Sequence, residues 1–218
     1  MPDEKFKILL VDDHPLVREW LGSLINQQPD LVVCGEAESA TEALGYLGAV
    51  SPDLAIVDLS LKEGSGLELI KTIRAAHPAV AVIVLSMHDE KHYAERAIRA
   101  GACGYVMKRE TTKKIIAAIR QVRSGKLGVS DEVAALFAER FVGNHPRLRT
   151  PVEELSDREL EVFRLLGQGL DTRSVATTLR ISIKTVQAYC ARIKDKLNLA
   201  NATELLREAV RWSESGAY

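Results

Sequence analysis

Five polar or charged side chains stand at the ends of short apolar runs in the first half of the chain. They are Asp12, Asp13, Asp58, Ser86 and Lys108. Three carboxylates that share one crevice repel each other, at on the order of 4 kcal/mol per pair for a separation of ~4 Å and an effective dielectric near ~20. A raised pKa or a bound cation relieves this repulsion. With Mg²⁺ on the oxygen ligands and the ammonium of Lys108 beside them, such a set could hold a phosphoryl group that Asp58 accepts as an acyl phosphate.

The elements that must position these residues alternate regularly. Short apolar runs at residues 7–11, 31–34, 54–57, 80–85 and 104–107 are each followed by apolar residues at helical spacing. Because the runs are continuously apolar, both faces of the sheet that they form must be covered by helices, as in a parallel sheet. Ligands of such sheets bind beyond the carboxyl ends of the strands. We therefore predict an α/β unit of five parallel strands with the five side chains at one edge.

Four blocks of this unit resemble the receiver domain of bacterial two-component response regulators. They read V-D-D-H at 11–14, I-V-D-L-S-L at 56–61, V-L-S-M at 84–87 and G-Y-V-M-K at 104–108. The resemblance implies a flavodoxin-like fold with strand order 2-1-3-4-5 and Asp58 as the phosphoacceptor. It implies Mg²⁺ bound by Asp12, Asp13, Asp58 and the backbone carbonyl of Ser60. It also implies that Ser86 and Lys108 contact the phosphoryl group, that Tyr105 is an aromatic switch, and that Ser60 and His88 tune hydrolysis.

Simpler interpretations of single residues stay open. Asp12 could be the N-cap of the first helix, Tyr105 an ordinary half-buried strand residue and His88 a polar loop residue. The chain also departs from the family pattern, because Arg109 follows Lys108 where the family usually has proline. A cis bond before arginine would cost ~3 kcal/mol more than trans, so this loop could take a different geometry. The loop at residues 62–66 differs from the family as well.

The second half of the chain is predicted to be entirely helical. Ser156-Asp157-Arg158-Glu159 is a capping box that opens a helix, and Asp171, Ser182 and Asn201 are candidate N-caps of three more. A further helix is predicted over residues 131–142, before a Gly-Asn-His-Pro breaker. We therefore expect a receiver domain at 1–124, a helical linker at 125–150 and a small all-helical domain at 151–218.

Two of these helices, at 173–180 and 183–197, are separated by a short turn, and the second is strongly basic. Residues 180–197 carry five basic side chains against one acidic side chain, a net of +4. In helix-turn-helix proteins the second helix enters the major groove of DNA. The simpler interpretation is an ordinary amphipathic surface helix, with Val186, Ile193 and Leu197 as its inward stripe.

The helical half resembles the four-helix DNA-binding domain of the LuxR type. The blocks are L-S-D-R-E-L-E-V at 155–162, L-L-G-Q-G-L at 165–170, S-V-A-T-T-L at 174–179, I-S-I-K-T-V at 181–186 and R-I-K-D-K-L at 192–197. The DNA-facing candidates are Lys184, Thr185, Gln187, Ala188, Arg192 and Lys196, among which Gln187 could read adenine edges. The last helix, from Ala202 to Val210, would either form the dimer contact or only pack in the core of its own domain.

The whole chain thus resembles a response regulator of the NarL/FixJ class. The resemblance implies a transcription regulator, not an enzyme, that a histidine kinase phosphorylates at Asp58 and that then binds DNA half-sites as a homodimer. The alternative is a phosphorylation-independent DNA-binding regulator with an atypical receiver.

Composition and motifs argue against other classes. The formal net charge of −1 excludes a polybasic protein, and three distant cysteines (Cys34, Cys103, Cys190) argue against a disulfide framework. A phosphatase with an aspartate nucleophile would usually carry a second aspartate where Ser60 stands. A dinucleotide-binding enzyme would need glycines after the first strand. With no basic segment before the first apolar run and no bilayer-long apolar stretch, we expect a cytoplasmic protein without membrane contact.

Overall fold

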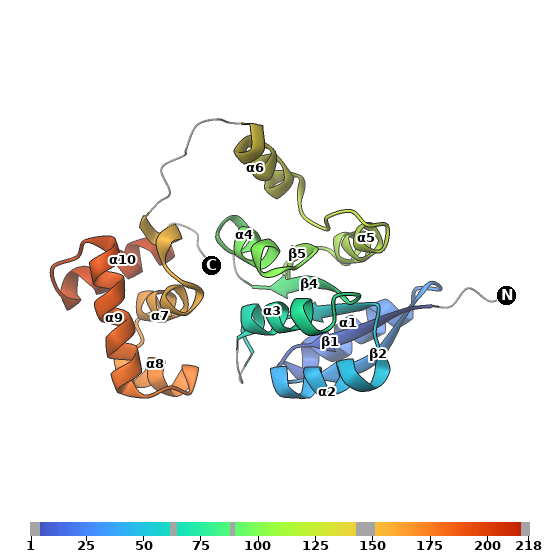
Figure 1. The fold of residues 1–218 in the computed structure, drawn as a ribbon, viewed down its shortest axis with the longest axis horizontal. Coiled ribbons are helices and arrows are strands. Elements are labelled where there is room, and N and C mark those ends of the chain that lie inside the picture. Colours follow the sequence, from blue (N-terminus) through green and yellow to red (C-terminus); the bar gives the residue numbers. More distant parts are fainter. Residues whose placement is uncertain (1–4, 62–64, 88–89, 143–150, 215–218) are drawn as a thin grey trace. The chain divides into compact units, whose positions relative to one another are not determined.

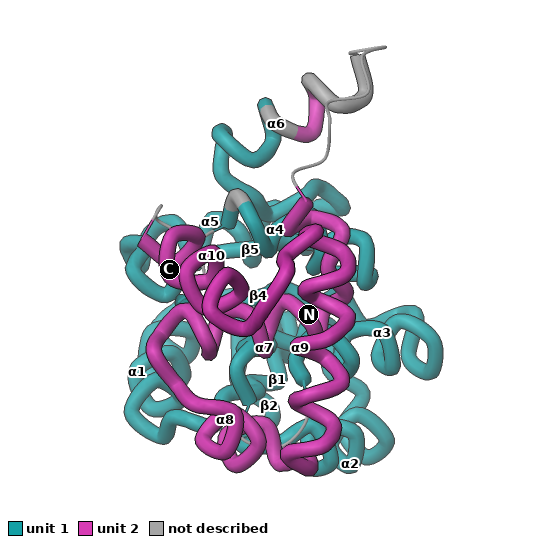
Figure 2. Tube along the Cα trace, turned by 90° about the vertical axis from the view of Figure 1, so that its left-hand side faces the viewer, with its two compact units in different colours: residues 1–135 teal, residues 136–218 magenta. Residues whose placement is uncertain are grey.

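The computed structural model describes residues 5–61, 65–87, 90–142 and 151–214. The chain divides into two compact units, Met1–Ala135 and Leu136–Tyr218, and the boundary falls inside one helix (Figure 2). Each unit has its own core and is described by itself.

The first unit is built on a five-stranded parallel sheet (Figure 1). Its strands are β1 (Phe6–Val11), β2 (Leu31–Ala37), β3 (Leu54–Val57), β4 (Ala81–Ser86) and β5 (Gly104–Met107). They lie in the order β2-β1-β3-β4-β5, which confirms the predicted fold class. Val11 pairs with both Ala37 and Val57, so the first three strands end level with one another. The polar residues that follow these strands are thereby brought to one edge.

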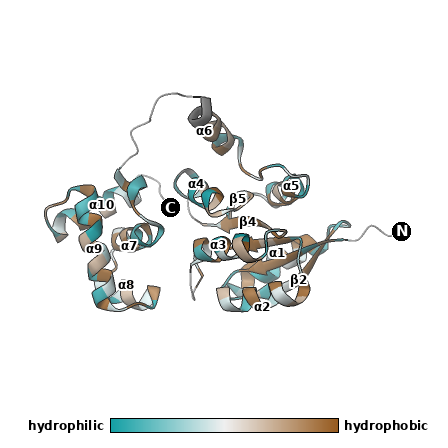
Figure 3. Ribbon diagram, in the orientation of Figure 1, coloured by the Kyte–Doolittle hydropathy of each residue, from teal (hydrophilic) through white to brown (hydrophobic). Residues whose placement is uncertain are grey.

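Helices cover both faces of the sheet. On one face α1 (Pro15–Asn26) and α5 (Thr112–Arg123) pack against alternate strand residues such as Ile8 and Ile56. The remaining helices of the unit are α2 (Ala40–Val50), α3 (Gly66–Ala76) and α4 (Glu90–Ala100). Of these, α2 contacts β1 and β2, α4 contacts β5, and α3 lies between them. The inner strands are mostly apolar while the helices are apolar on one side, as expected for a sheet buried between two layers (Figure 3).

The segment after α5 extends the sheet beyond its last strand. The backbone N–H of Gly128 donates to the carbonyl of Cys103, and the N–H of Tyr105 donates to the carbonyl of Gly128, both at 2.9 Å. Close approach requires glycine here, since a Cβ on Gly104 would lie 2.7 Å from the Gly128 oxygen. The hydroxyl of Ser130 then donates to Glu90 on α4 at 2.8 Å.

The predicted helix over residues 131–142 follows as α6 (Asp131–Val142). Its Val133 is 1% exposed, so the start of α6 is anchored on the first unit. Residues 143–150 of the predicted linker lie outside the described part of the chain.

The second unit is helical throughout its described residues. It consists of a 3-10 turn at Pro151–Glu154 and the helices α7 (Asp157–Gly167), α8 (Thr172–Leu179), α9 (Ile183–Leu197) and α10 (Ala202–Glu214). All four predicted N-caps are observed, because the side chains of Ser156, Asp171, Ser182 and Asn201 each accept a backbone N–H three residues on. No helix within the described residues has the length and apolar character needed to cross a membrane.

The core of the second unit joins all four helices. Phe163, Val186 and Ile193 are fully buried, and the ring of Trp212 packs on Phe163 with a centroid distance of 5.7 Å. The last helix continues beyond the predicted end at Val210 because Trp212 and Ser213 also pack inward, while Leu206 remains 46% exposed.

Candidate functional site

The ends of the strands bring the predicted acidic residues and Lys108 together. The N–H of Asp58 donates to the carbonyl of Val11 at 2.8 Å, which joins the end of β3 to the end of β1. In the same way the N–H of Lys108 donates to the carbonyl of Ser86 at 2.8 Å, which joins β5 to β4. Backbone hydrogen bonds between neighbouring strands therefore position the site before any side-chain contact is made.

The ammonium of Lys108 lies between two carboxylates. Its Nζ is 2.6 Å from Asp12 Oδ2 and 2.8 Å from Asp58 Oδ2. These three side chains are at most 8% exposed, so the charges interact away from bulk water. Ser86, at the end of β4, is fully buried. Hydrogen-bonded charges at this depth attract more strongly than the same pair on a surface.

Burial dominates the electrostatics of the site. It raises the pKa of the Asp58 carboxyl above its usual value, and it outweighs the opposing effects of Lys108 and of a backbone hydrogen bond from Ser60. Burial alone would lower the pKa of Lys108, but the carboxylates of Asp58 and Asp12 more than compensate and raise it. The lysine therefore stays charged, and Asp58 is a carboxylate held in an unfavourable environment.

Asp13 and His14 complete the cluster. One possible ligand atom from each of Asp12, Asp13, His14 and Asp58 lies within 4.8 Å of the others, which suits a metal ion. Asp13 is 5% exposed, and its Oδ1 accepts no hydrogen bond from the described residues. A buried carboxylate oxygen without a donor fits the oxygen-ligand chemistry of a divalent cation. His14, not Asp12, is the N-cap residue of α1, so the simpler interpretation of Asp12 as that cap is wrong.

Two features of the surrounding loops bear on the departures from the family pattern. The bond between Lys108 and Arg109 is trans, and Lys108 still reaches both carboxylates, so Arg109 does not displace it. Gly66, at the start of α3, passes so close to the end of β3 that a Cβ there would lie 2.3 Å from the carbonyl oxygen of Asp58. Residues 62–64 and His88 lie outside the described residues.

Tyr105 lies on β5 and is 1% exposed. It is therefore fully buried, whereas the simpler interpretation expects a half-buried strand residue. It lines a small cavity together with Glu90 of α4 and with Gly128 and Ser130, which precede α6. Glu90 is itself 7% exposed and accepts the Ser130 hydroxyl. Sequence analysis did not single out Glu90 or Ser130, because a glutamate in the first turn of a helix is usually solvated.

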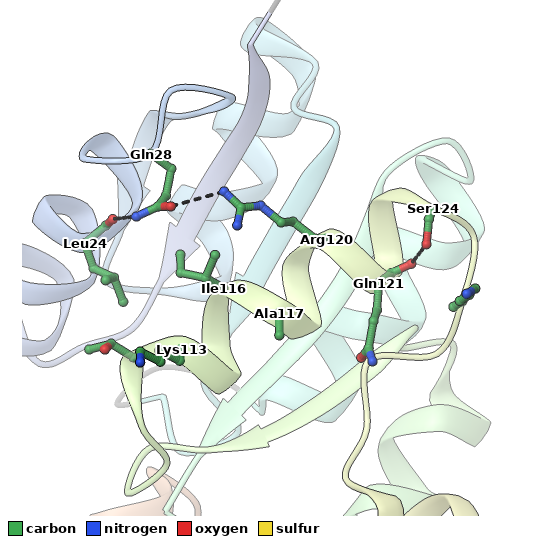
Figure 4. A pocket seen from close by; sticks show the side chains of 10 residues that line it. Leu24, Gln28, Lys113, Ile116, Ala117, Arg120, Gln121 and Ser124 are labelled. Atoms are coloured by element: carbon green, nitrogen blue, oxygen red, sulfur yellow. Dashed lines mark hydrogen bonds between the residues drawn. The ribbon is translucent and has the colours of Figure 1, made fainter.

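A separate groove lies between α1 and α5 (Figure 4). Arg120 donates to Gln28 at 3.1 Å, and Gln28 donates to the carbonyl of Leu24 at 3.4 Å. Arg120 and Arg123 also pair with Asp30 at 2.9 and 3.1 Å. No residue that lines this groove belongs to the acidic cluster.

The basic helix α9 presents most of its DNA-facing candidates to solvent. Lys184, Gln187, Ala188 and Arg192 are exposed and Thr185 is half-buried, whereas Val186 and Ile193 are fully buried and Leu197 is half-buried. The guanidinium of Arg192 lies over the ring of Tyr189, 5.8 Å from its centroid. One face of α9 is thus packed inward, and the other carries the exposed candidates.

Lys196 differs from the other candidates because it is already paired. Its Nζ is 2.7 Å from Glu159 Oε2 and donates to the carbonyl of Glu154 at 3.2 Å. Glu159 is 3% exposed. Burial alone would raise the pKa of Glu159, but Lys196 and the N-cap hydrogen bonds of Ser156 outweigh it and hold that pKa below its usual value. Lys196 therefore connects α9 to α7 within the unit.

Comparison with known proteins identifies both units. The family model of the response regulator receiver domain matches residues 8–120, which is more than half of the chain. The model of the bacterial regulatory proteins of the luxR family matches residues 153–209. The chain belongs to the response regulators.

Relatives match this response regulator over nearly its full length. The oxygen regulatory protein NreC of Staphylococcus carnosus is 32% identical over 210 residues, which is 94% of this chain and 97% of NreC. The solved structure of RcsB from Salmonella enterica serovar Typhimurium, bound to the promoter rprA with the phosphomimetic BeF3⁻, is 26% identical with a TM-score of 0.67. That match covers 94% of this chain and 98% of RcsB.

A second RcsB structure, from Salmonella typhimurium, has a TM-score of 0.71 at 26% identity and covers 95% of this chain and 98% of RcsB. The response regulator is thus a DNA-binding regulatory protein of a two-component system, as predicted.

Proposed function

We propose that a histidine kinase phosphorylates this response regulator at Asp58 and that phosphorylation controls its binding to promoter DNA. The observation that carries the proposal is the pair of contacts from Lys108 to Asp58 and Asp12, at 2.8 and 2.6 Å, inside a buried acidic cluster. A carboxylate at high electrostatic cost beside a fixed ammonium is suited to accept a phosphoryl group and to hold its added charge.

In the transfer step, an oxygen of Asp58 forms a bond to phosphorus while the bond from phosphorus to the donor breaks, which leaves an acyl phosphate. Mg²⁺, when bound by Asp12, Asp13, Asp58 and the carbonyl of Ser60, would neutralise negative charge on the phosphoryl oxygens. Lys108 supplies the second positive charge, and the hydroxyl of Ser86 would donate to a phosphoryl oxygen. The kinase supplies the phosphohistidine donor.

The signal would leave the site through β5. Movement of Ser86 and Tyr105 toward the phosphoryl group would change the surface formed by α4, β5 and α5, because Tyr105 borders the cavity that Glu90 and Ser130 share. The phosphoryl group can shift only an equilibrium between states that it binds differently. We infer that the favoured state is a homodimer, in line with the RcsB dimers seen on DNA.

The DNA contacts are proposed for the exposed face of α9. Lys184 and Arg192 would pair with phosphates or guanine edges, Gln187 would read an adenine edge, and Thr185 and Ala188 would lie against the groove. The phosphate contact proposed for Lys196 would have to compete with its pairing to Glu159.

In this proposal the receiver domain spans residues 1–124, the helical linker 125–150 and the DNA-binding domain 151–218. Because chromosomal DNA and a kinase would be its partners, we infer that the protein acts in the cytoplasm.

Intact-mass spectrometry after incubation with acetyl phosphate and Mg²⁺ tests the acceptor. We expect one phosphoryl adduct on the wild type, no adduct on Asp58→Asn, and an unchanged adduct on Asp131→Asn, which alters an exposed aspartate of the same unit. An adduct that persists on Asp58→Asn would contradict the assignment of the acceptor.

Measuring DNA affinity with and without the phosphodonor tests the control of binding. The wild type should bind more tightly after phosphorylation and Asp58→Asn should not respond. Equal affinities of both proteins in both conditions would favour the alternative of a phosphorylation-independent regulator.

A further inference from the structure

Arg18 reaches from the first turn of α1 back to the loop that carries Asp12 and Asp13. Its Nη1 donates to the backbone carbonyl of Asp12 at 2.5 Å. Because side chains lean toward the N-terminus of their helix, a residue one turn into α1 can contact the loop that precedes it. The Arg18 side chain is 15% exposed, whereas arginine side chains are mostly exposed to water. The guanidinium is therefore packed against this loop and is not a solvated surface charge.

Glu36 on β2 contacts the other side of the guanidinium. Its Oε2 is 3.4 Å from Arg18 Nε. The register between β1 and β2 shifts after Ile8, so that Leu10 pairs with Glu36. Paired residues of neighbouring strands point to the same face, and Leu10 belongs to the core under α1 and α5. The register shift thus directs Glu36 toward α1, as irregular pairing near functional sites commonly re-aims a side chain.

The carbonyl that Arg18 contacts belongs to the peptide group between Asp12 and Asp13. A peptide group is planar, so a hydrogen bond to its carbonyl restrains the orientation of both residues. The N–H of Asp12 is held separately, since it donates to the carbonyl of Ala37 at 3.1 Å. Asp13 Oδ1 accepts no hydrogen bond from the described residues, so the backbone has to direct this oxygen toward the cluster. Arg18 restrains the peptide group on which that direction depends.

Charge repulsion makes such a restraint necessary. Oxygens of Asp12, Asp13 and Asp58 lie within 4.8 Å of one another, and like charges at this spacing push the loop away from β3. Arg18, Asp12 and Asp58 also line a void of about 10 Å³, which has room for about one water. A rigid, planar guanidinium that contacts both the loop and β2 opposes displacement of the loop better than a single flexible donor would.

We propose that Arg18 is a positioning residue of the phosphorylation site and holds the Asp12–Asp13 backbone in the arrangement that binds the divalent cation. The inference rests on the metal site of the proposed function and adds to it a residue outside the acidic cluster. Arg18 acts through the Asp12 carbonyl and not on the phosphoryl group. Loss of a group that only orients metal ligands typically costs about 10- to 100-fold in metal affinity or activity.

Calorimetric titration with Mg²⁺ tests the effect on the cation site. Arg18→Met removes the donors but keeps an apolar stem of similar length, and we expect it to bind Mg²⁺ roughly tenfold or more weakly than the wild type. Arg18→Lys keeps the charge without the planar pair of donors and should recover only part of this loss. The control Arg99→Met removes an exposed arginine on α4 that pairs with Glu95 at 2.7 Å, and it should leave the affinity unchanged.

Amide hydrogen exchange in metal-free buffer tests the loop itself. The N–H of His14 donates to Asp12 Oδ1 at 2.9 Å, so a loosened loop should expose it. We expect this N–H to exchange several-fold faster in Arg18→Met than in the wild type and in Arg99→Met. A residue that only stabilised α1 would lower the melting temperature without changing Mg²⁺ affinity or this local exchange.

An unchanged Mg²⁺ affinity or an unchanged exchange rate of the His14 N–H in Arg18→Met overturns the inference and leaves the proposed function intact. If Arg18→Met does not fold, equal Mg²⁺ affinities of the wild type and Arg18→Lys overturn it.

The adduct on Asp58 separates the inference from the proposed function. Absence of Mg²⁺ binding by the wild type would overturn the inference and remove the metal from the proposed function. Weakened Mg²⁺ binding in Arg18→Met, together with no adduct on Asp58 of the wild type, would support the inference and count against the proposed acceptor.

Discussion

The carboxylate of Asp58 is 3% exposed and yet must be ionised to accept a phosphoryl group. Its raised pKa means that the folded protein binds a proton at Asp58 more tightly than the unfolded chain does. The ionised side chain therefore lowers the stability of the fold at every pH above that raised value. The site keeps a reactive group at the expense of folding free energy, a common feature of functional sites.

Replacing Asp58 with asparagine should relieve this cost. In metal-free buffer near neutral pH we expect Asp58→Asn to be more stable by about 1 kcal/mol, the size of a typical single-residue effect. Lys108 keeps Asp12 as a partner at 2.6 Å. The gain should grow as the pH rises from the ordinary aspartate pKa of about 4 through the raised pKa of Asp58, and then level off.

Thermal unfolding of the wild type and Asp58→Asn across this pH range measures the effect. Glu19→Gln removes an exposed carboxylate on α1 and serves as the control, with little change expected. A stability difference that is independent of pH would show that the effect does not arise from ionisation of Asp58.

Gly66 lets α3 lie close to Asp58 because it has no side chain. A Cβ at this position would meet the Asp58 carbonyl and the Leu59 Cα at 2.3 and 2.6 Å. Gly66→Ala should therefore push α3 away from the end of β3, cost about 1–3 kcal/mol of stability and slow phosphorylation by acetyl phosphate. Gly45→Ala on α2, where a Cβ meets nothing within 4 Å, is the matched control: it should leave the phosphorylation rate unchanged and raise stability by about 0.5–1 kcal/mol, since alanine favours a helix interior over glycine.

Much of the acidic site is predictable from the sequence, since residues that follow parallel strands must meet at one edge. Asp12, Asp13, Asp58 and Lys108 come together for that reason. The direction of the His14 ring and the pairing of Lys196 with Glu159 depend instead on rotamers and on contacts 37 residues apart, which no local pattern encodes. Tyr105 is buried because the segment around Gly128 covers the last strand, and that pairing has no sequence signal beyond two glycines.

At the scale of elements, local hydrogen bonds explain why the helices of the second unit begin where the sequence predicts. Ser, Asp and Asn at the N-cap each satisfy a free N–H of the first turn, and this chemistry is readable from residue types alone. The end of α10 was not predictable in the same way. The helix continues to Glu214 because Trp212 packs against Phe163, and this contact joins residues far apart in the sequence.

The ring of Tyr189 is expected to orient Arg192 on the exposed face of α9. An exposed cation–π contact is worth about 0.5–1 kcal/mol, which corresponds to roughly two- to fivefold in affinity. Tyr189→Leu should weaken DNA binding by that factor, whereas Tyr189→Phe keeps the ring and should bind nearly as well as the wild type.

Fluorescence anisotropy with labelled operator DNA at several salt concentrations measures this effect. The slope of log affinity against log salt should stay the same in Tyr189→Leu and fall by about 1 in Lys184→Ala, which removes a proposed phosphate contact. Equal affinities of Tyr189→Leu and Tyr189→Phe would mean that the ring does not orient Arg192.

At the scale of the whole molecule, each unit has a separate core. In the second unit Phe163, Val186 and Ile193 are fully buried, and α7, α9 and α10 all contact one another. A fragment of residues 151–218 should therefore fold into a helical domain by itself. We expect it to bind operator DNA with an affinity that does not respond to acetyl phosphate, in contrast to the full chain.

Circular dichroism and anisotropy on the fragment and on the full chain make the comparison. A fragment that is unfolded, or one whose DNA affinity still changes with the phosphodonor, would contradict the expectation. Lys184→Ala within the fragment is the control that its binding uses the same helix.

The backbone of Gly128 has a further consequence for the edge of the sheet. Unpaired strand edges are templates on which a second chain can add a strand and begin to aggregate. The hydrogen bonds between Gly128 and β5 close this edge with residues that lie beyond α5. A receiver cut after Ser124 would present an open, apolar β5 to solvent and to its own copies. A cut after Ala135 would keep the edge closed. We therefore expect the longer fragment to remain monodisperse and the shorter one to self-associate, although the eleven residues between the two cuts contain no residue of the acidic cluster.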